Sequence, residues 1–111
     1  MVIAGIVLLM TITASPAWAT IAFVQSASQD ASCPTSLAFT SNNAPGNAII
    51  VGIRLGNATD VPVVTDSTGN TYTEDRRQTF GTGRAFIYSA PNTAGGANTV
   101  SVSTCGGIRW A

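Results

Sequence analysis

Beyond residue 19, hydrophobic residues occur in short alternating runs separated by turn-forming residues. The clearest run covers 48–55, where every second residue from Ile49 to Leu55 is aliphatic and Gly52 and Arg54 occupy the opposite face. Alternation with a period of two indicates a β-strand with one buried face. The pattern predicts strands at 20–25, 36–40, 48–55, 61–65, 71–79, 84–90 and 98–104, and the start of another at 108–110.

This spacing of strands predicts an all-β fold, because no segment after residue 19 keeps a helical periodicity over three turns. Short strands separated by turns are typical of an antiparallel β-sandwich, Ig-like or jelly-roll-like. The turn residues Asp66–Asn70 predict a hairpin between 61–65 and 71–79. We expect one domain over 20–111, incomplete at its C-terminus, because the sequence stops at Ala111 inside an apparent strand.

Residues 1–19 have the features of a signal peptide. An apolar run from Val2 to Met10 is followed by Pro16 and by Ala17-Trp18-Ala19, the small-residue pattern that signal peptidase accepts. No Lys or Arg precedes the apolar run, so the usual positive region is missing. An uncleaved anchor running to Val24 and a core segment are the alternatives. The prediction is a secreted or cell-surface protein that meets the membrane only through this segment.

The two cysteines, Cys33 and Cys105, suit an exported chain. In oxidising compartments such a pair is more often a disulfide than two free thiols. The alternatives are that either thiol is a small buried residue or pairs with a group outside this sequence. We therefore predict a Cys33–Cys105 bridge from the compartment alone.

Composition and charge narrow the function. The chain has five basic and five acidic residues, no His, and a mean hydropathy of +0.29 that mostly reflects the N-terminal segment. All five basic residues are arginines. A neutral chain lacks the basic surface that binds nucleic acid through counterion release, and the absence of His excludes histidine-based catalysis and metal ligation. We expect no cofactor and no nucleic-acid partner.

Several motifs give the chain a family resemblance. They are Phe23-Val24-Gln25, Ser36-Leu37-Ala38-Phe39, the stretch 45–53, the stretch 64–73 with its Asp-Ser-Thr-Gly-Asn-Thr-Tyr core, Tyr88-Ser89-Ala90-Pro91-Asn92 and the stretch 95–100. Over roughly 20–110 the chain resembles uncharacterised β-sandwich modules of large exported proteins of environmental bacteria. The resemblance implies secretion and a sandwich fold, and it supplies no active site.

Aromatic and arginine side chains are the candidates for ligand binding. Tyr72 and Tyr88 could stack on sugar rings, and Arg76 and Arg84 could hydrogen-bond sugar hydroxyls beside them. Phe80, Phe86 and Trp110 are further aromatic residues. The competing interpretation, which we favour, is that aromatic side chains fill the core.

Two acidic motifs have structural interpretations. Asp66 and Asn70 flank a tight turn and are weak candidates for Ca²⁺ ligands, but Ca²⁺ needs six to eight oxygens, so we expect them to bond the turn itself. Glu74 and Asp75 are adjacent on a predicted strand and therefore point to opposite faces, which argues against paired-carboxylate catalysis. With the arginines that follow, they predict an exposed charged strand edge.

Taken together, these features predict a non-enzymatic exported module for adhesion, cell-surface architecture or weak glycan binding, with glycans or other cell-surface components as partners. The alternative is an accessory, non-catalytic domain of a larger secreted enzyme such as a glycoside hydrolase. The neighbouring coding sequence would distinguish the two.

Overall fold

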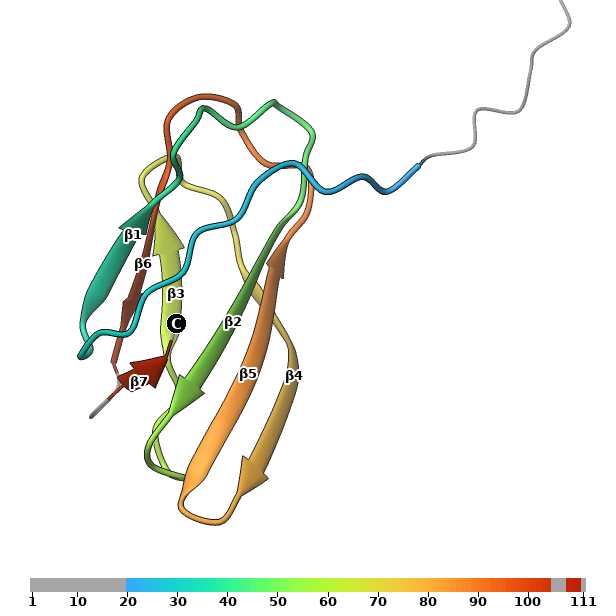
Figure 1. The fold of residues 1–111 in the computed structure, drawn as a ribbon. Helices are drawn as coiled ribbons and strands as arrows, with labels where there is room; N and C mark the ends of the chain where they lie inside the picture. Colours follow the sequence, from blue (N-terminus) through green and yellow to red (C-terminus); the bar gives the residue numbers. More distant parts are fainter. Residues whose placement is uncertain (1–19, 105–107, 111) are drawn as a thin grey trace, which may run out of the picture.

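The computed structural model describes residues 20–104 and 108–110, and in this part of the chain the fold is all-β and antiparallel with no helix (Figure 1). Three strands form one sheet in the order β1-β6-β3, and four form a second sheet in the order β4-β5-β2-β7. The strands are β1 (Thr35–Ala38), β2 (Ile49–Leu55), β3 (Val63–Asp66), β4 (Thr73–Phe80), β5 (Gly83–Ala90), β6 (Thr99–Ser103) and β7 (Ile108–Trp110).

The two sheets share one hydrophobic core. The four-stranded sheet contributes alternate residues of β2 and β5, and the three-stranded sheet contributes one residue each from β3 and β6. These core residues are Ile53, Leu55, Phe86, Tyr88, Val64 and Val102. The rings of Phe86 and Tyr88 stack with centroids 6.1 Å apart. Because both sheets bury one face against the other, the period of two in the sequence decides which residues enter the core.

Most of the predicted strands are confirmed. The alternation over 48–55 gives β2, whose residues Ile53 and Leu55 are fully buried while Ile50, Gly52 and Arg54 face solvent. The charged segment after Thr73 forms β4, which lies at one edge of its sheet as the charges predicted.

Two predicted elements are wrong. Residues 20–25 form no strand, and the segment that contains them crosses the domain as an extended chain. The turn at Asp66–Asn70 does not close a hairpin, because β3 pairs with β6 and β4 pairs with β5. The turn instead carries the chain from one sheet to the other. Sequence alternation identifies a strand but not its partner, and here Val64 pairs with Val102 of β6 across the three-stranded sheet.

The predicted leader and the predicted disulfide lie wholly or partly outside the described residues. Residues 1–19 and Cys105 are outside, and Cys33 is described. Cys33 packs against the core, and its Sγ lies 3.8 Å from the carbonyl oxygen of Val102. Thr35 pairs with Val102 in the β1–β6 register. Cys33, two residues before Thr35, therefore lies near the end of β6, the strand that precedes Cys105 in the sequence. The bridge stays a prediction that this register favours.

Candidate binding surface

The two tyrosines proposed as a sugar platform both contact the core, Tyr88 as a buried residue and Tyr72 as a half-buried one. Tyr88 is only 6% exposed, and its hydroxyl donates a hydrogen bond to the carbonyl oxygen of Pro62 at 2.8 Å. Burial, reinforced by the nearby Glu74 carboxylate, raises the pKa of Tyr88. Tyr72 packs against the core and donates its hydroxyl to Oδ2 of Asp66 at 2.8 Å. Tyr88 therefore offers no open face to a ligand, whereas Tyr72 is half-buried and has its hydroxyl engaged by Asp66.

The two predicted arginines lie on different sides of the four-stranded sheet. Arg84 follows the inward register of β5 and donates from Nε to Oγ1 of Thr79 at 3.2 Å. Its Nη1 is 3.4 Å from the carbonyl oxygen of Asp60. Arg76 pairs with the outward residue Ile87 and is exposed. The structure thus does not bring Tyr72, Arg76, Arg84 and Tyr88 together on one surface.

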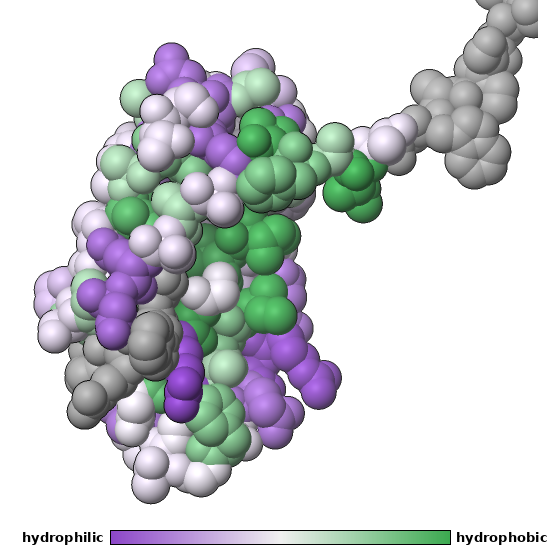
Figure 2. Space-filling model, viewed as in Figure 1, coloured by the Kyte–Doolittle hydropathy of each residue, from purple (hydrophilic) through white to green (hydrophobic). Residues whose placement is uncertain are grey.

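A different set of residues does share a surface, the outward face of β4, β5 and β2, which we call the outer face. In the register, Ile50 lies beside Ser89 and Thr73, Gly52 beside Ile87 and Arg76, and Arg54 beside Ala85 and Gln78. The side chain of Ile50 is 65% exposed and that of Ile87 45%. Figure 2 shows this mixture of hydrophobic surface over β2 and β5 with hydrophilic side chains beside it.

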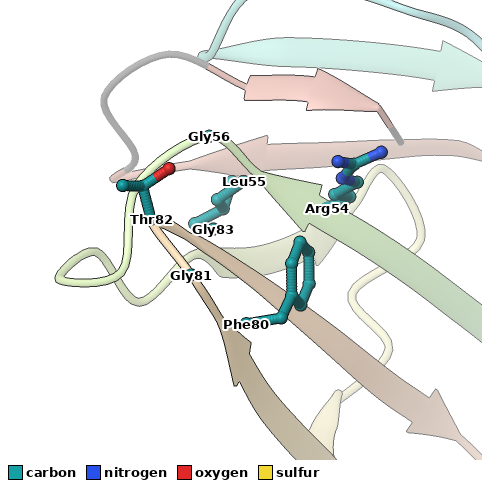
Figure 3. Close-up of a pocket in the computed structure, with 7 residues that line it drawn as sticks. All are labelled: Arg54, Leu55, Gly56, Phe80, Gly81, Thr82 and Gly83. Atoms are coloured by element: carbon teal, nitrogen blue, oxygen red, sulfur yellow. The ribbon is translucent and has the colours of Figure 1, made fainter.

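The end of the outer face forms a shallow pocket at the β4–β5 turn (Figure 3). The guanidinium carbon of Arg54 lies 5.3 Å from the centroid of the Phe80 ring, a cation–π geometry. The ring also lies over Gly83, where a Cβ would be only 2.8 Å from Cε2 of Phe80. The pocket has a volume of about 480 Å³, and Gly56, Gly81 and Thr82 complete its lining with Leu55.

Within the part of the chain that the structure describes, Arg54 and Arg76 on the outer face form no ion pair. An ion pair joins Arg77 to Glu74 instead. Arg77 belongs to the other side of β4, where its guanidinium lies 5.3 Å from the centroid of the buried Phe86 ring. Arg54 and Arg76 therefore keep N–H groups that an incoming ligand could accept from.

The weak metal candidates, Asp66 and Asn70, form a structural network. Oδ1 of Asp66 accepts hydrogen bonds from both the backbone and the hydroxyl of Thr68 and from the backbone of Asn70, at 3.0 to 3.2 Å. Oδ2 accepts from the side chains of Asn70, Tyr72 and Asn98, at 2.7 to 2.9 Å. All of these donors occupy the lone pairs that a cation would need. Within residues 20–104 and 108–110, no cluster of three or more His, Cys, Asp or Glu side chains could hold a metal ion.

The hydrogen bonds also determine the charge of this network. Partial burial acts to raise the pKa of Asp66, but the hydrogen bonds from Asn98, Asn70 and Tyr72 outweigh it and hold the pKa well below its usual range. Burial and the Asp66 carboxylate together raise the pKa of the Tyr72 hydroxyl. The network is thus a fixed anion surrounded by neutral donors, which stabilises the crossing between the sheets.

The adjacent acids Glu74 and Asp75 do not act as a pair. A bulge between Glu74 and Arg76 leaves Asp75 without a strand partner. Both oxygens of Glu74 accept from Arg77, at 2.8 and 2.9 Å. These hydrogen bonds are the main cause that lowers the pKa of Glu74.

Arg54 was missed as a site residue, although the alternation had placed it on the exposed face of its strand. What the sequence lacked was the register that brings Phe80 beside it across β5.

No protein-family model, curated protein or solved structure matches this chain. The described residues also include no helix long and apolar enough to cross a membrane.

Proposed function

We propose that this chain is a non-enzymatic exported module that attaches to glycans of a cell surface or matrix through the outer face of its four-stranded sheet. The observation that carries the proposal is the combination, on one exposed sheet face, of apolar side chains with two arginines that form no ion pair with any described residue. Two antiparallel sheets around one core support a sandwich scaffold of the Ig-like or jelly-roll-like kind.

The chemistry of this face matches that of a sugar chain. Pyranose rings present C–H groups that pack on exposed apolar side chains such as Ile50, Ile87 and Phe80. Guanidinium groups donate in a planar fork to vicinal hydroxyls and, more strongly, to carboxylates. Arg54 and Arg76 lie on two neighbouring rows of the face, so one oligosaccharide lying along β2 and β5 could meet both. We infer that sugars bearing carboxylates bind better than neutral ones.

The shape of the face implies low affinity. The outer face is open, and the hollow at its end is the shallow pocket between Arg54 and Phe80. Few ligand atoms are desolvated on such a surface, so we expect a dissociation constant near 1 mM, or roughly −4 kcal/mol. Weak sites of this kind act through repetition on a surface, since linked copies raise the effective concentration. This supports a role in adhesion rather than in capture of a soluble ligand.

The test is an NMR titration of the protein with two oligosaccharides of equal length, one neutral and one of uronic acids. We expect amide shift changes confined to β2, β4 and β5, larger for the uronic acid and weakened by salt. Arg54→Ala and Arg76→Ala should each weaken binding at least threefold.

Arg77→Ala is the matched control, because Arg77 lies on the opposite side of β4, and it should leave the affinity unchanged. Shift changes elsewhere, or equal binding by the Arg54→Ala variant, would contradict the proposal.

A further inference from the structure

The strand register holds the two arginines of the outer face apart. Arg54 on β2 lies in the same row as Ala85 of β5. Arg76 on β4 lies in the neighbouring row, beside Ile87 of β5. Neighbouring strands are about 4.8 Å apart, and successive rows on one face of a sheet are about 6.7 Å apart. Two strand spacings and one row therefore separate the Cα atoms of the two arginines by roughly 12 Å.

The guanidinium group of Arg54 lies on the far side of its strand from Arg76. Its carbon is 5.3 Å from the centroid of the Phe80 ring. Phe80 pairs with Gly83, one row further from Arg76 than the row of Arg54 is (Figure 3). The cation–π contact thus directs the charge of Arg54 away from Arg76. The two cations are separate anchors for a ligand, and they do not form one clamp around a single carboxylate.

The surface between the two anchors is apolar. Ile87, which is 45% exposed, lies beside Arg76, and Ala85 lies beside Arg54. The two rows that hold the anchors contain no acidic residue on β2, β4 or β5. A ligand that contacts both arginines must therefore pass over Ile87 and Ala85. An anionic group at that middle position would lose hydration without gaining a partner, which is unfavourable.

The separation of the anchors can be compared with the length of a sugar. Bond lengths of about 1.5 Å make one linked pyranose ring roughly 5 Å long. Carboxylates on adjacent sugars of an extended chain are therefore too close together to contact both anchors. Carboxylates on the first and third sugars are about 10 Å apart, which is close to the separation of the arginines. The exposed side chain of Arg76 can rotate to cover the remaining difference.

We propose that the outer face recognises acidic polysaccharides that carry a carboxylate on every second sugar. Arg54 and Arg76 each bind one carboxylate, and the sugar between them packs on Ile87. This inference rests on the proposed function and adds to it the spacing of the charges on the ligand. Charge-assisted hydrogen bonds supply each contact, and joining the two carboxylates in one ligand raises the effective concentration for the second contact.

The test is an NMR titration of the exported protein with three trisaccharides. They carry carboxylates on the first and third sugars, on the first and second sugars, or on the first sugar only. The first two have the same charge, so a general attraction to arginine would bind them equally. We expect the first trisaccharide to bind at least threefold more tightly than the second. Arg76→Ala should abolish this preference.

A matched pair of variants tests the path of the ligand. Ile87→Thr should weaken binding of the first trisaccharide at least twofold, because the middle sugar loses an apolar contact. Ile50→Thr is the control, since Ile50 is an exposed isoleucine of the same face that lies one row outside the path between the anchors. It should leave the affinity for a trisaccharide unchanged. Both variants change exposed side chains, and circular dichroism will confirm that they fold.

The failure of this inference is distinguishable from failure of the proposed function. Equal binding of the two doubly charged trisaccharides, with shift changes that still depend on Arg54 and Arg76, would overturn the spacing alone. A preference that survives Arg76→Ala, or equal effects of the two isoleucine variants, would also overturn it. The absence of shift changes in β2, β4 and β5 with every trisaccharide would overturn both.

Discussion

The Asp66 network offers the sharpest test of how the fold is held together. Six hydrogen bonds converge on this carboxylate, three on each oxygen. Their donors come from the turn after β3, from Tyr72 before β4 and from Asn98 before β6. Asp66→Asn keeps the shape but replaces one acceptor oxygen with a donor. Whichever way the new amide turns, three donors lose their acceptor and the negative charge is gone.

The loss of stability caused by Asp66→Asn depends on which of the former donors can hydrogen-bond to water instead. The turn residues Thr68 and Asn70 can rehydrate, whereas Asn98 is only 3% exposed and cannot. Hydrogen bonds to a charged group contribute about 1.5–3 kcal/mol each, and a buried donor left unsatisfied costs about 1–3 kcal/mol. Allowing for partial rehydration, we expect Asp66→Asn to lower the free energy of unfolding by about 2–4 kcal/mol.

The pH dependence provides a second, independent measure of the same network. Because the folded pKa of Asp66 is depressed, the unfolded chain takes up a proton first as the pH falls. The ordinary Asp pKa is about 3.9, so the contribution is complete at pH 7 and is lost progressively below about pH 5. Asp66→Asn should remove this part of the acid sensitivity.

The assay is urea unfolding followed by circular dichroism at pH 7 and pH 3, on the parent, on Asp66→Asn and on the control Asp30→Asn. Asp30 is exposed and lies outside the network, so its substitution should change stability by less than about 0.5 kcal/mol. A loss below about 0.5 kcal/mol for Asp66→Asn at pH 7, or an unchanged pH dependence, would refute the reasoning.

Three further predictions concern the glycine under the Phe ring, the cysteines and the N-terminus. Gly83→Ala should destabilise the domain by about 1–3 kcal/mol in urea unfolding, because its Cβ would lie 2.8 Å from a ring atom, whereas Gly52→Ala should be close to neutral, since nothing lies within 4 Å of that position. Non-reducing mass analysis of exported protein should find a peptide linking Cys33 to Cys105, and quantitative alkylation of both without reduction would exclude the bridge. The same mass spectra should show an N-terminus at Thr20, and an intact leader in a soluble cytosolic fraction would contradict it.

The strands could be predicted from the sequence because burial of one face imposes a period of two. The run from Ile49 to Leu55 is fully specified by this rule, and the structure places it at the centre of the larger sheet. The rule fails for Thr20–Gln25, where alternation is present but no neighbouring strand pairs with it. A strand exists only with a partner, and local pattern does not report whether a partner is available.

The candidate site was less predictable because it depends on register between strands distant in sequence. Tyr88 and Arg54 each follow the alternation of their own strands, and the sequence assigned Arg54 correctly to the exposed face. Arg54 meets Phe80 only because β2 pairs with β5 in one register and β5 pairs with β4 in another. The second register also depends on the bulge at Asp75. Shifting one register by one residue would place Phe80 on the other face.

The bulge in β4 makes the two margins of the larger sheet unequal. On the β4 side the strand carries four consecutive charged residues and a local kink, a combination that rejects an added strand. The other margin is the short strand β7, which pairs with β2 at Arg54 and Leu55 across a register shift. Lateral addition of a strand at the β4 margin is therefore disfavoured, and this protects that side of the sheet from the continuous hydrogen-bonded stacking from which fibrils grow.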